Sequence, residues 1–401
     1  MEPSGDGSIA RPVDSRPGVD GVSAPPWLLV AGDFVRTGGM DAANHALAAH
    51  LARSGRETHL VAHRVDEELA GTRGIEVHRV RRPLGSHLLG FPLLSMAGAR
   101  AASRLGDDAH SVANGGNFPG RDACWLHYVH AAYRPTVAGR PLRRMIDGAA
   151  RRMALADERR VASRARIVLC NSELTARHAV ELLGAEPDRV HTVYYGTDAD
   201  RFRPPSIEER DRARAALGID GDRPALAFVG ALGDRRKGFD TLFAACGRLA
   251  ADPAWDAVLL VVGTGAELER WKARAAAGGM GERVRFLGFR AEVREVLSAC
   301  DALVSPTRYE AYGLAIHEAM SMGLPAIVSR DAGVAERIPH ALDGLLLDDP
   351  EDVGELAERL RGWRAGMEAH RAAAMELSGG LRGWTWDHMA ARIVDIVEGA
   401  G

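Results

Sequence analysis

Short apolar runs alternate with longer amphipathic segments along almost the whole chain. The short runs predict buried β-strands, while segments such as Asp41–Ser54 and Phe239–Ala251 show the apolar spacing of helices. The runs are Trp27–Ala31, His59–Ala62, Val77–Val80, Trp125–Val129, Ile167–Cys170 and Val190–Tyr194 in the first half, and Ala225–Val229, Val258–Val262, Val284–Leu287, Ala302–Ser305, Ala326–Ser329 and Leu345–Leu347 in the second. This alternation predicts an α/β fold with parallel sheets that carry helices on both faces. The runs are too many for one ordinary sheet, so we expect two domains.

The boundary between the domains is a polar stretch. Residues 196–224 carry turn residues and charge, followed by a short helical pattern and a new strand. We therefore place the boundary near Arg203–Ser206 and expect an N-terminal domain over residues 26–204 and a C-terminal domain over residues 205–380. Residues 381–401 form an amphipathic helix that either ends the second domain or crosses back to the first.

The composition is that of an ordinary globular enzyme, with 46% hydrophobic and 26% charged residues. The formal net charge of −3 argues against a nucleic-acid partner. The four cysteines have no Cys-x-x-Cys spacing, which suits a reduced compartment and gives no zinc motif. Residues 1–25 are polar and rich in glycine, proline and serine, so we expect a disordered tail and no secretory signal. No apolar run approaches the length of a membrane span, and a cytoplasmic location is expected.

Candidate ligand-binding residues follow several predicted strands. Ligands of open parallel sheets bind at the carboxyl ends of the strands, so two facing sheets predict a cleft between the domains. After the first strand, Gly38 and Gly39 precede a helix whose free N–H groups suit an anion, with an ordinary loop as the alternative. His127 and His130 lie at or just past the end of a later strand. A lone histidine is more often structural, but two in one segment favour a cleft.

In the second half, three cations precede a helix. Arg235, Arg236 and Lys237 lie just before the helix expected at Phe239–Ala251. Positive charge at a helix N-terminus opposes the helix dipole unless an anion shares the site. A solvated loop is the alternative, but the position after a strand favours a phosphate site.

The stretch YEAYGLAIHEAMSMGLP, residues 309–325, carries two carboxylates. Glu310 lies in the loop after a strand, and Gly313 and Leu314 open a helix whose N–H groups can hold a phosphate. Glu318 follows inside this helix, among alanine and methionine residues that indicate burial. A buried carboxylate needs hydrogen-bond partners, and the paired hydroxyls of a sugar suit it. A solvent-facing position is the alternative.

This stretch resembles the EX7E region of family 4 glycosyltransferases, which have the GT-B fold of two Rossmann-like domains facing a cleft. The resemblance extends to GGMDAANHALAAHLARSGRETHLVA, NSELTARH, VHTVYYGTDADRFRP, RRKGFDTL, VVGTGAELE and DAGVAERI. It covers nearly the whole chain after residue 26. The combination is specific for the family but not for the substrate.

The resemblance implies a retaining glycosyltransferase that moves a sugar from a nucleotide-diphosphate donor to an acceptor hydroxyl, without a metal ion or another cofactor. UDP-sugars are the expected donors and GDP-mannose the second choice. The acceptor is a glycan, a lipid-linked sugar or a small metabolite. The alternatives are a nucleotide-sugar epimerase or a glycosyl phosphorylase on the same fold, and a paralogue that only binds nucleotide-sugars.

The resemblance also assigns roles by position. It implies that Glu310 contacts the transferred sugar and that Glu318 holds the ribose hydroxyls. A histidine after an N-domain strand would lie near the reacting edge of the sugar. His130 fits that position best, and His127 is the second choice.

The diphosphate is assigned to Lys237, with Gly38 and Gly39 approaching it from the opposite domain. The family usually has an arginine where this chain has Ala231. We expect Arg235 or Arg236 to supply the missing cation.

An arginine-rich stretch suggests a further contact. Residues 134–166 hold ten arginines against Asp147, Asp157 and Glu158. Such a basic stretch on helices of the N-terminal domain would contact anionic lipid headgroups and place the protein peripherally on the inner membrane face. A solvated helical face is the alternative.

Overall fold

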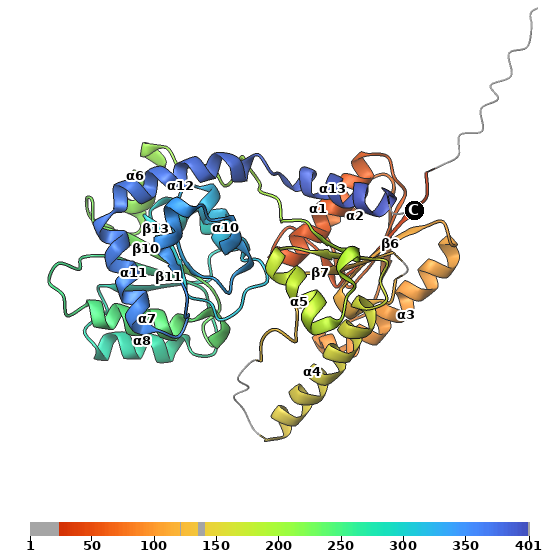
Figure 1. Cartoon of the computed structure of the whole chain (residues 1–401), viewed down its shortest axis with the longest axis horizontal. Helices are drawn as coiled ribbons and strands as arrows, with labels where there is room; N and C mark the ends of the chain where they lie inside the picture. The colour runs from red at the N-terminus through yellow and green to blue at the C-terminus, as the bar shows by residue number, and fades with distance from the viewer. Residues whose placement is uncertain (1–23, 121, 135–140, 400–401) are drawn as a thin grey trace, which may run out of the picture.

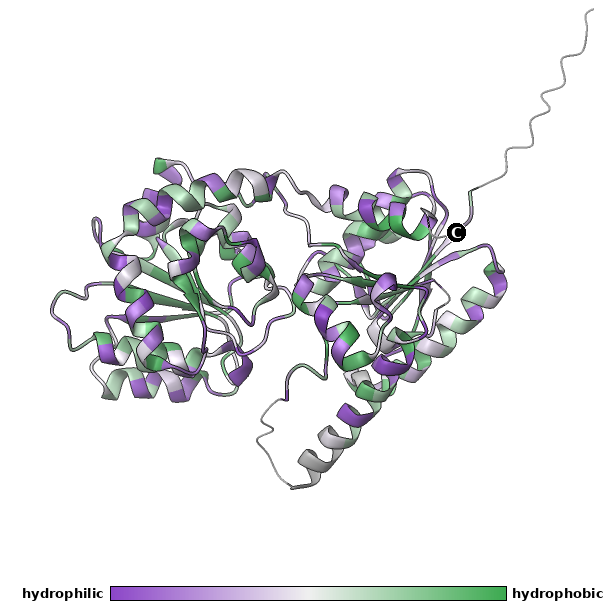
Figure 2. Ribbon diagram, viewed as in Figure 1, coloured by the Kyte–Doolittle hydropathy of each residue, from purple (hydrophilic) through white to green (hydrophobic). Residues whose placement is uncertain are grey.

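The computed structural model describes residues 24–120, 122–134 and 141–399. These residues form two lobes, each a parallel sheet with helices packed on it (Figure 1). Hydrophobic residues are concentrated on the strands at the centre of each lobe (Figure 2), as expected for strands covered on both faces. The predicted α/β fold with two parallel-sheet domains is confirmed. Most of the predicted tail, residues 1–23, lies outside the described residues.

The N-terminal lobe is built on a sheet with the strand order β5-β3-β1-β6-β7-β8-β9. Its strands are β1 (Trp27–Val30), β3 (Thr58–Ala62), β5 (Ile75–Arg79), β6 (His110–Asn114), β7 (Ala123–Leu126), β8 (Ile167–Cys170) and β9 (Val190–Thr192), with a separate short pair β2 (Asp33–Phe34) and β4 (Arg64–Val65). Its helices are α1 (Gly39–Arg53), α2 (Glu67–Ala70), α3 (His87–Leu105), α4 (Pro141–Ala162) and α5 (Glu173–Leu183).

The C-terminal lobe has the strand order β12-β11-β10-β13-β14-β15. Its strands are β10 (Ala225–Val229), β11 (Val258–Val262), β12 (Val284–Gly288), β13 (Ala302–Ser305), β14 (Ala326–Ser329) and β15 (Leu346–Leu347). Its helices are α6 (Ile207–Ala216), α7 (Phe239–Leu249), α8 (Leu268–Ala277), α9 (Val293–Ser298), α10 (Leu314–Ser321), α11 (Val353–Ala365) and α12 (Met367–Arg382). Every strand expected in this half of the chain is present.

The strand order reverses between β1 and β6 in the first sheet and between β10 and β13 in the second. The connections that leave such neighbouring strands run to opposite sides and open a crevice at the carboxyl ends of the strands. The segments after these strands are therefore the places where a ligand is expected.

The last helix returns to the first lobe. Helix α12 packs on α10, whereas α13 (Trp386–Gly399) packs on α1 in the N-terminal lobe (Figure 1). Its residues Met389, Ile393 and Val397 are fully buried, and Arg56 pairs with Glu398 at 2.7 Å. The chain thus crosses back after it has completed the second lobe.

The sequence prediction missed β6, which lies beside β1 at the centre of the first sheet. The segment HSVAN has only Val112 and Ala113 as an apolar pair between polar residues, so no apolar run marks it. Strand β7 ends at Leu126, earlier than predicted, which leaves both candidate histidines in the loop that follows. Among the described residues, no helix has the length and apolarity needed to cross a membrane.

Candidate active site

Glu310 lies in the loop after β13, where the C-terminal sheet reverses its strand order. Its Oε2 accepts a hydrogen bond from Arg236 Nη1 at 3.3 Å and forms an ion pair with Lys237 Nζ. The side chains are mostly buried, with exposed fractions of 18% for Glu310, 17% for Arg236 and 22% for Lys237. Arg236 also forms an ion pair with Asp234 at 3.1 Å, so the cluster holds two cations and two carboxylates. The cationic N–H groups of Arg236 and Lys237 suit a phosphate.

Arg235 lies outside this cluster. Its Nη2 donates to the Asp240 carboxylate at 2.9 Å, and its side chain is 55% exposed. Of the two arginines expected to replace the one missing at Ala231, the structure therefore brings Arg236 to Glu310.

Two helix N-termini meet between the lobes. Helix α1 begins at Gly39 and α10 begins at Leu314, and neither has a side-chain cap. A Cβ on Gly39 would lie 3.6 Å from the Leu314 Cβ, so the two helix ends are neighbours in space. Their preceding residues, Gly38 and Gly313, have φ values of 85° and 105°, which glycine adopts without steric cost. Uncapped N–H groups of two helices thus lie together, and such groups suit an anion.

Glu318 is half-buried on α10, and its carboxylate makes no hydrogen bond or ion pair with any described residue. Burial raises the pKa of its carboxyl to about 8 from 4.5, with a smaller opposing effect of Arg201 and a smaller raising effect of Asp198. A partly buried carboxyl without a partner is costly, so hydroxyl donors of a ligand would stabilise it.

His127 is a buried histidine directly after β7 in the N-terminal lobe. Its Nδ1 lies 2.6 Å from the Tyr195 hydroxyl and its Nε2 lies 3.2 Å from Asn114 Oδ1. Burial lowers its pKa to about 3, so the ring is neutral at physiological pH. Because both ring nitrogens have protein partners, His127 positions its neighbours and offers no free nitrogen to a substrate.

His130 has a different environment, with 48% of its side chain exposed. Its Nδ1 lies 3.0 Å from Glu158 Oε1, and its backbone N–H donates to Glu158 Oε2 at 3.0 Å. The buried carboxylate favours the tautomer with the proton on Nδ1 and leaves Nε2 as an acceptor for a hydroxyl. Glu158 was not predicted as a site residue, because in the sequence it only interrupts a basic stretch.

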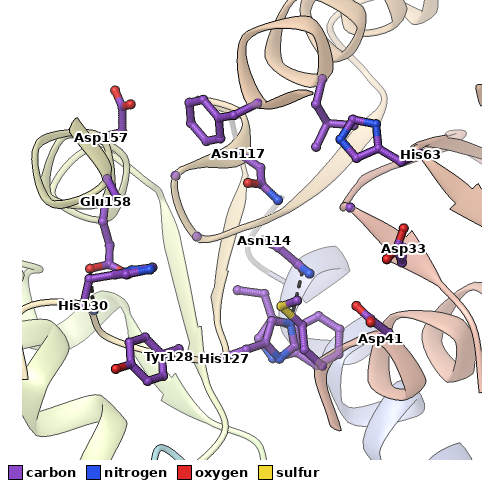
Figure 3. Close-up of a pocket in the computed structure, with 18 of the residues that line it drawn as sticks. Asp33, Asp41, His63, Asn114, Asn117, His127, Tyr128, His130, Asp157 and Glu158 are labelled. Atoms are coloured by element: carbon purple, nitrogen blue, oxygen red, sulfur yellow. Dashed lines mark hydrogen bonds and ion pairs between the residues drawn. The ribbon is translucent and has the colours of Figure 1, made fainter. Parts of the chain in front are cut away.

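A cavity of about 690 Å³ lies at the carboxyl ends of β1 and β6, the reversal point of the N-terminal sheet. Figure 3 shows His130 and Glu158 on one side of this pocket and Asp33, Asp41 and His63 on the other. The lining also includes Met40, Arg64, Arg82, Phe91, Leu94, Asn114, Asn117, Trp125, His127, Tyr128, Met153 and Asp157. The pocket combines apolar walls with many hydrogen-bonding groups.

The buried polar atoms of pocket residues that lack a hydrogen-bond partner in the described part of the chain include Asp33 Oδ1, Asp41 Oδ1 and Asn114 Nδ2. Burial and the charge of Asp33 raise the pKa of Asp41 to about 6. Such atoms cost free energy unless a ligand or water satisfies them. The sequence prediction missed all three residues. The signal for each was its position: Asp33 begins β2, shortly after β1, Asp41 lies in the first turn of α1, and Asn114 ends the unrecognised β6.

Tyr128 connects this pocket to the Glu310 cluster. It lines the pocket, and the Arg236 guanidinium lies 5.7 Å from the centre of its ring. The ring of Tyr309 meets it edge-on at 5.1 Å, and the Tyr309 hydroxyl accepts the N–H of Val129 at 3.1 Å. The two lobes are therefore in contact here, with the pocket on one side and Glu310 on the other.

The arginine-rich stretch 134–166 is described only in part, since residues 135–140 lie outside the described residues. Arg151 donates to two backbone carbonyls and Arg160 pairs with Asp157 at 2.8 Å. Part of the positive charge is thus used within the protein. The expected contact with an anionic membrane stays a prediction.

Known proteins resemble this chain in both halves. A family model described as Glycosyltransferase Family 4 matches residues 37–201, and one described as Glycosyl transferases group 1 matches residues 223–363. The D-inositol 3-phosphate glycosyltransferase 1 of Catenulispora acidiphila is 32% identical over 63% of this chain and 63% of its own length. A D-inositol 3-phosphate glycosyltransferase of Nocardia farcinica is 30% identical over 61% of this chain and 54% of its own length. The match thus spans less than two thirds of these relatives.

Solved structures share the fold. WaaG, a glycosyltransferase involved in lipopolysaccharide biosynthesis, has a TM-score of 0.76 at 21% identity, over 93% of this chain and 100% of its own. HepE of Anabaena, solved with UDP and glucose, has a TM-score of 0.71 at 17% identity, over 93% of this chain and 99% of its own. Two Rossmann-like lobes that meet at their reversal points define the GT-B class of glycosyltransferases. Within that class, this chain belongs to glycosyltransferase family 4.

Proposed function

We propose that this protein is a retaining glycosyltransferase that moves a sugar from a nucleotide-diphosphate donor to an acceptor hydroxyl. The observation that carries the proposal is Glu310, held between Arg236 and Lys237 at the reversal point of the C-terminal sheet. Cations and the free N–H groups at the start of α10 suit a diphosphate, and a carboxylate suits the sugar attached to it. A UDP-sugar is our first choice of donor, supported by the HepE structure with UDP-glucose, and GDP-mannose is the second.

The proposed reaction breaks the bond between the anomeric carbon and the diphosphate oxygen. The electron pair of that bond leaves with the diphosphate, whose growing negative charge Lys237 and Arg236 stabilise. The acceptor hydroxyl oxygen bonds to the same face of the anomeric carbon, which retains the configuration. Its proton passes to the departing phosphate oxygen. Glu310 favours the positive charge that develops on the sugar.

Other residues would orient the donor. Glu318 would accept hydrogen bonds from the ribose hydroxyls, which supply the partners that its carboxyl lacks. His130 Nε2 would accept a hydrogen bond from a hydroxyl of the transferred sugar. The hydrogen bond between His130 Nδ1 and Glu158 would keep the ring in this orientation. Gly38 and Gly39 would let the backbone approach the diphosphate closely.

We propose that the pocket of the N-terminal lobe holds the acceptor. The unpartnered atoms of Asp33, Asp41 and Asn114 suit a molecule with several hydroxyl groups, because hydroxyls both donate and accept hydrogen bonds. The names of the curated relatives support a small phosphorylated polyol as one candidate. Glycans and lipid-linked sugars are the other acceptor classes to be tested.

We also propose that the reaction needs no metal ion and no cofactor beyond the nucleotide-sugar. Arg236 and Lys237 supply at the diphosphate the positive charge for which other enzymes use a divalent cation. Activity that survives chelation would support this point, whereas activity restored only by added Mg²⁺ or Mn²⁺ would contradict it.

The decisive experiment measures donor cleavage with and without acceptors. The protein is first screened for stabilisation by UDP-, GDP- and ADP-sugars, and the stabilising donor is then incubated with inositol phosphates, oligosaccharides and lipid-linked sugars. We expect nucleotide diphosphate to appear only when an acceptor is present, together with a product whose mass includes the sugar. The anomeric coupling in the product's NMR spectrum tests retention. Stabilisation by none of the donors would contradict the proposal.

The same experiment separates the alternatives. An epimerase would change the donor without an acceptor, and a glycosyl phosphorylase would require inorganic phosphate and form a sugar phosphate. A paralogue that only binds nucleotide-sugars would be stabilised by a donor but release no nucleotide diphosphate with any acceptor.

A further inference from the structure

Three potential metal ligands lie on one face of the N-terminal sheet, on the neighbouring strands β3 and β5. His59 is paired in register with Glu76, and His78 follows Glu76 by two residues. Residues that pair directly in a parallel sheet, and residues two apart on a strand, point to the same face. The backbone therefore brings the three side chains together.

The distances between their ligand atoms match a tetrahedral metal site. His59 Nδ1 lies 3.1 Å from His78 Nε2 and 3.5 Å from Glu76 Oε2, and His78 Nε2 lies 3.5 Å from Glu76 Oε1. Zinc bonds to nitrogen and oxygen of about 2.0–2.1 Å at tetrahedral angles place two ligand atoms about 3.4 Å apart. The three groups can thus surround one ion without a change in the backbone, leaving the fourth position to water.

A fourth residue orients the first ligand. The other ring nitrogen of His59, Nε2, lies 3.0 Å from Glu57 Oε1. A carboxylate at this place favours the proton on Nε2, so that Nδ1 presents its lone pair toward His78 and Glu76. Metal-bound histidines commonly have such a carboxylate behind them.

The geometry points to a structural site for a divalent transition metal, with zinc the best match, formed by His59, Glu76 and His78 and supported by Glu57. His59 is buried and His78 is partly buried, whereas Glu76 is largely exposed, so an ion can enter from the surface. The ligands are two neutral histidine nitrogens and one carboxylate oxygen. This set suits zinc better than magnesium or calcium.

The expected role of the metal ion is to stabilise the pairing of the edge strand β5 with β3. Strand β5 is at the end of the sheet and pairs only with β3 in the described structure. The ligands belong to β3 and β5, whereas the strand order reverses between β1 and β6, and none of the three lines the pocket there. The inference is thus independent of the proposed function.

The experiment uses the full chain without an affinity tag, stripped with a chelator and titrated with Zn²⁺ against a chromophoric competitor. We expect one tightly bound zinc per chain and a zinc-dependent rise of the unfolding temperature. His78→Ala should lose both effects. Glu57→Gln should weaken binding by about 10- to 100-fold, as other losses of such supporting groups do. Co²⁺ in place of zinc should give the visible absorption of a tetrahedral site, absent in His78→Ala.

His340→Ala is the matched control, because His340 is a fully exposed histidine of the other lobe. It should bind zinc like the wild-type chain. Absence of tight zinc binding by the wild-type chain would overturn the inference and leave an ordinary hydrogen bond between two histidines. Zinc binding unchanged in both His78→Ala and Glu76→Gln would also overturn it, because the ion would then be an adventitious ion only.

Discussion

At the scale of single residues, Glu310 is the side chain on which the proposed chemistry depends most. Its carboxylate holds Arg236 and Lys237 in place and lies where the sugar is expected. We expect Glu310→Gln to lower kcat by about 100-fold or more, because a neutral amide no longer favours the developing positive charge. Steady-state kinetics with the best donor and acceptor would measure this loss.

Glu269→Gln is a suitable control, since Glu269 is an 81% exposed glutamate on α8 of the same lobe. Its kcat should equal that of the wild-type enzyme. If Glu310→Gln kept full activity as well, the assignment of the site would be wrong.

Glu318 should give the protein a pH-dependent stability. Its pKa is raised to about 8 in the folded state from 4.5, because burial disfavours the charged form. Between these values the folded state binds the proton that the unfolded state releases, so this contribution to the free energy of unfolding falls as pH rises from about 4.5 to about 8. Glu318→Gln should flatten this slope, as measured by urea unfolding across that range.

The same glutamate links donor binding to proton release. Ribose hydroxyls that donate to the carboxylate would lower its pKa, so binding near pH 7 should release a proton. Calorimetry of donor binding in buffers of different ionisation enthalpy would detect it. Unchanged binding enthalpy across the buffers would mean that Glu318 does not bind the donor as its anion.

At the scale of elements, one glycine lets the start of α7 pack closely against the residue that follows β13. Gly238 has a φ of 69°, and a Cβ on it would lie only 1.7 Å from the Pro306 carbonyl oxygen. This contact holds Lys237 beside the loop that carries Glu310. We expect Gly238→Ala to lower the free energy of unfolding by more than about 2 kcal/mol and to reduce activity, because the backbone must move to relieve the clash.

Gly362→Ala provides the matched glycine control. Gly362 lies inside α11, and a Cβ on it would have nothing within 4 Å. This substitution should raise the free energy of unfolding by about 0.4–1 kcal/mol. Chemical denaturation of both variants would measure the difference, and equal stabilities would show that the turn at Gly238 is easily rearranged.

At the scale of the whole molecule, α13 ties the end of the chain to the first lobe. Ile393 on this helix is fully buried against the N-terminal core. We expect Ile393→Ala to cost about 2–4 kcal/mol of stability through lost burial and the cavity left behind. Glu398→Gln on the same helix should cost less than about 1 kcal/mol, since its ion pair with Arg56 is partly exposed. A small effect of Ile393→Ala would mean that α13 is loosely attached.

The fold was more predictable than the site. Strands such as Val258–Val262 are continuous apolar runs, because both faces of the sheet are covered, and they stand out in the sequence. Strand β6 did not stand out, because two apolar residues between polar ones look like a loop. The failure to predict β6 also hid part of the site, since this strand ends at Asn114, which lines the pocket.

The sequence by itself determined two parallel-sheet domains, and the residues that local chemistry singled out for donor binding, above all the stretch from Glu310 to Glu318. These features depend on neighbours along the chain, through apolar runs, glycine positions and helix starts. Only the tertiary structure decided that Arg236 and not Arg235 reaches Glu310, that Glu158 holds His130, and that two helix N-termini meet between the lobes. The physical reason is that these partners come from segments distant in the chain, and their meeting depends on strand order and domain contact, which no local pattern records.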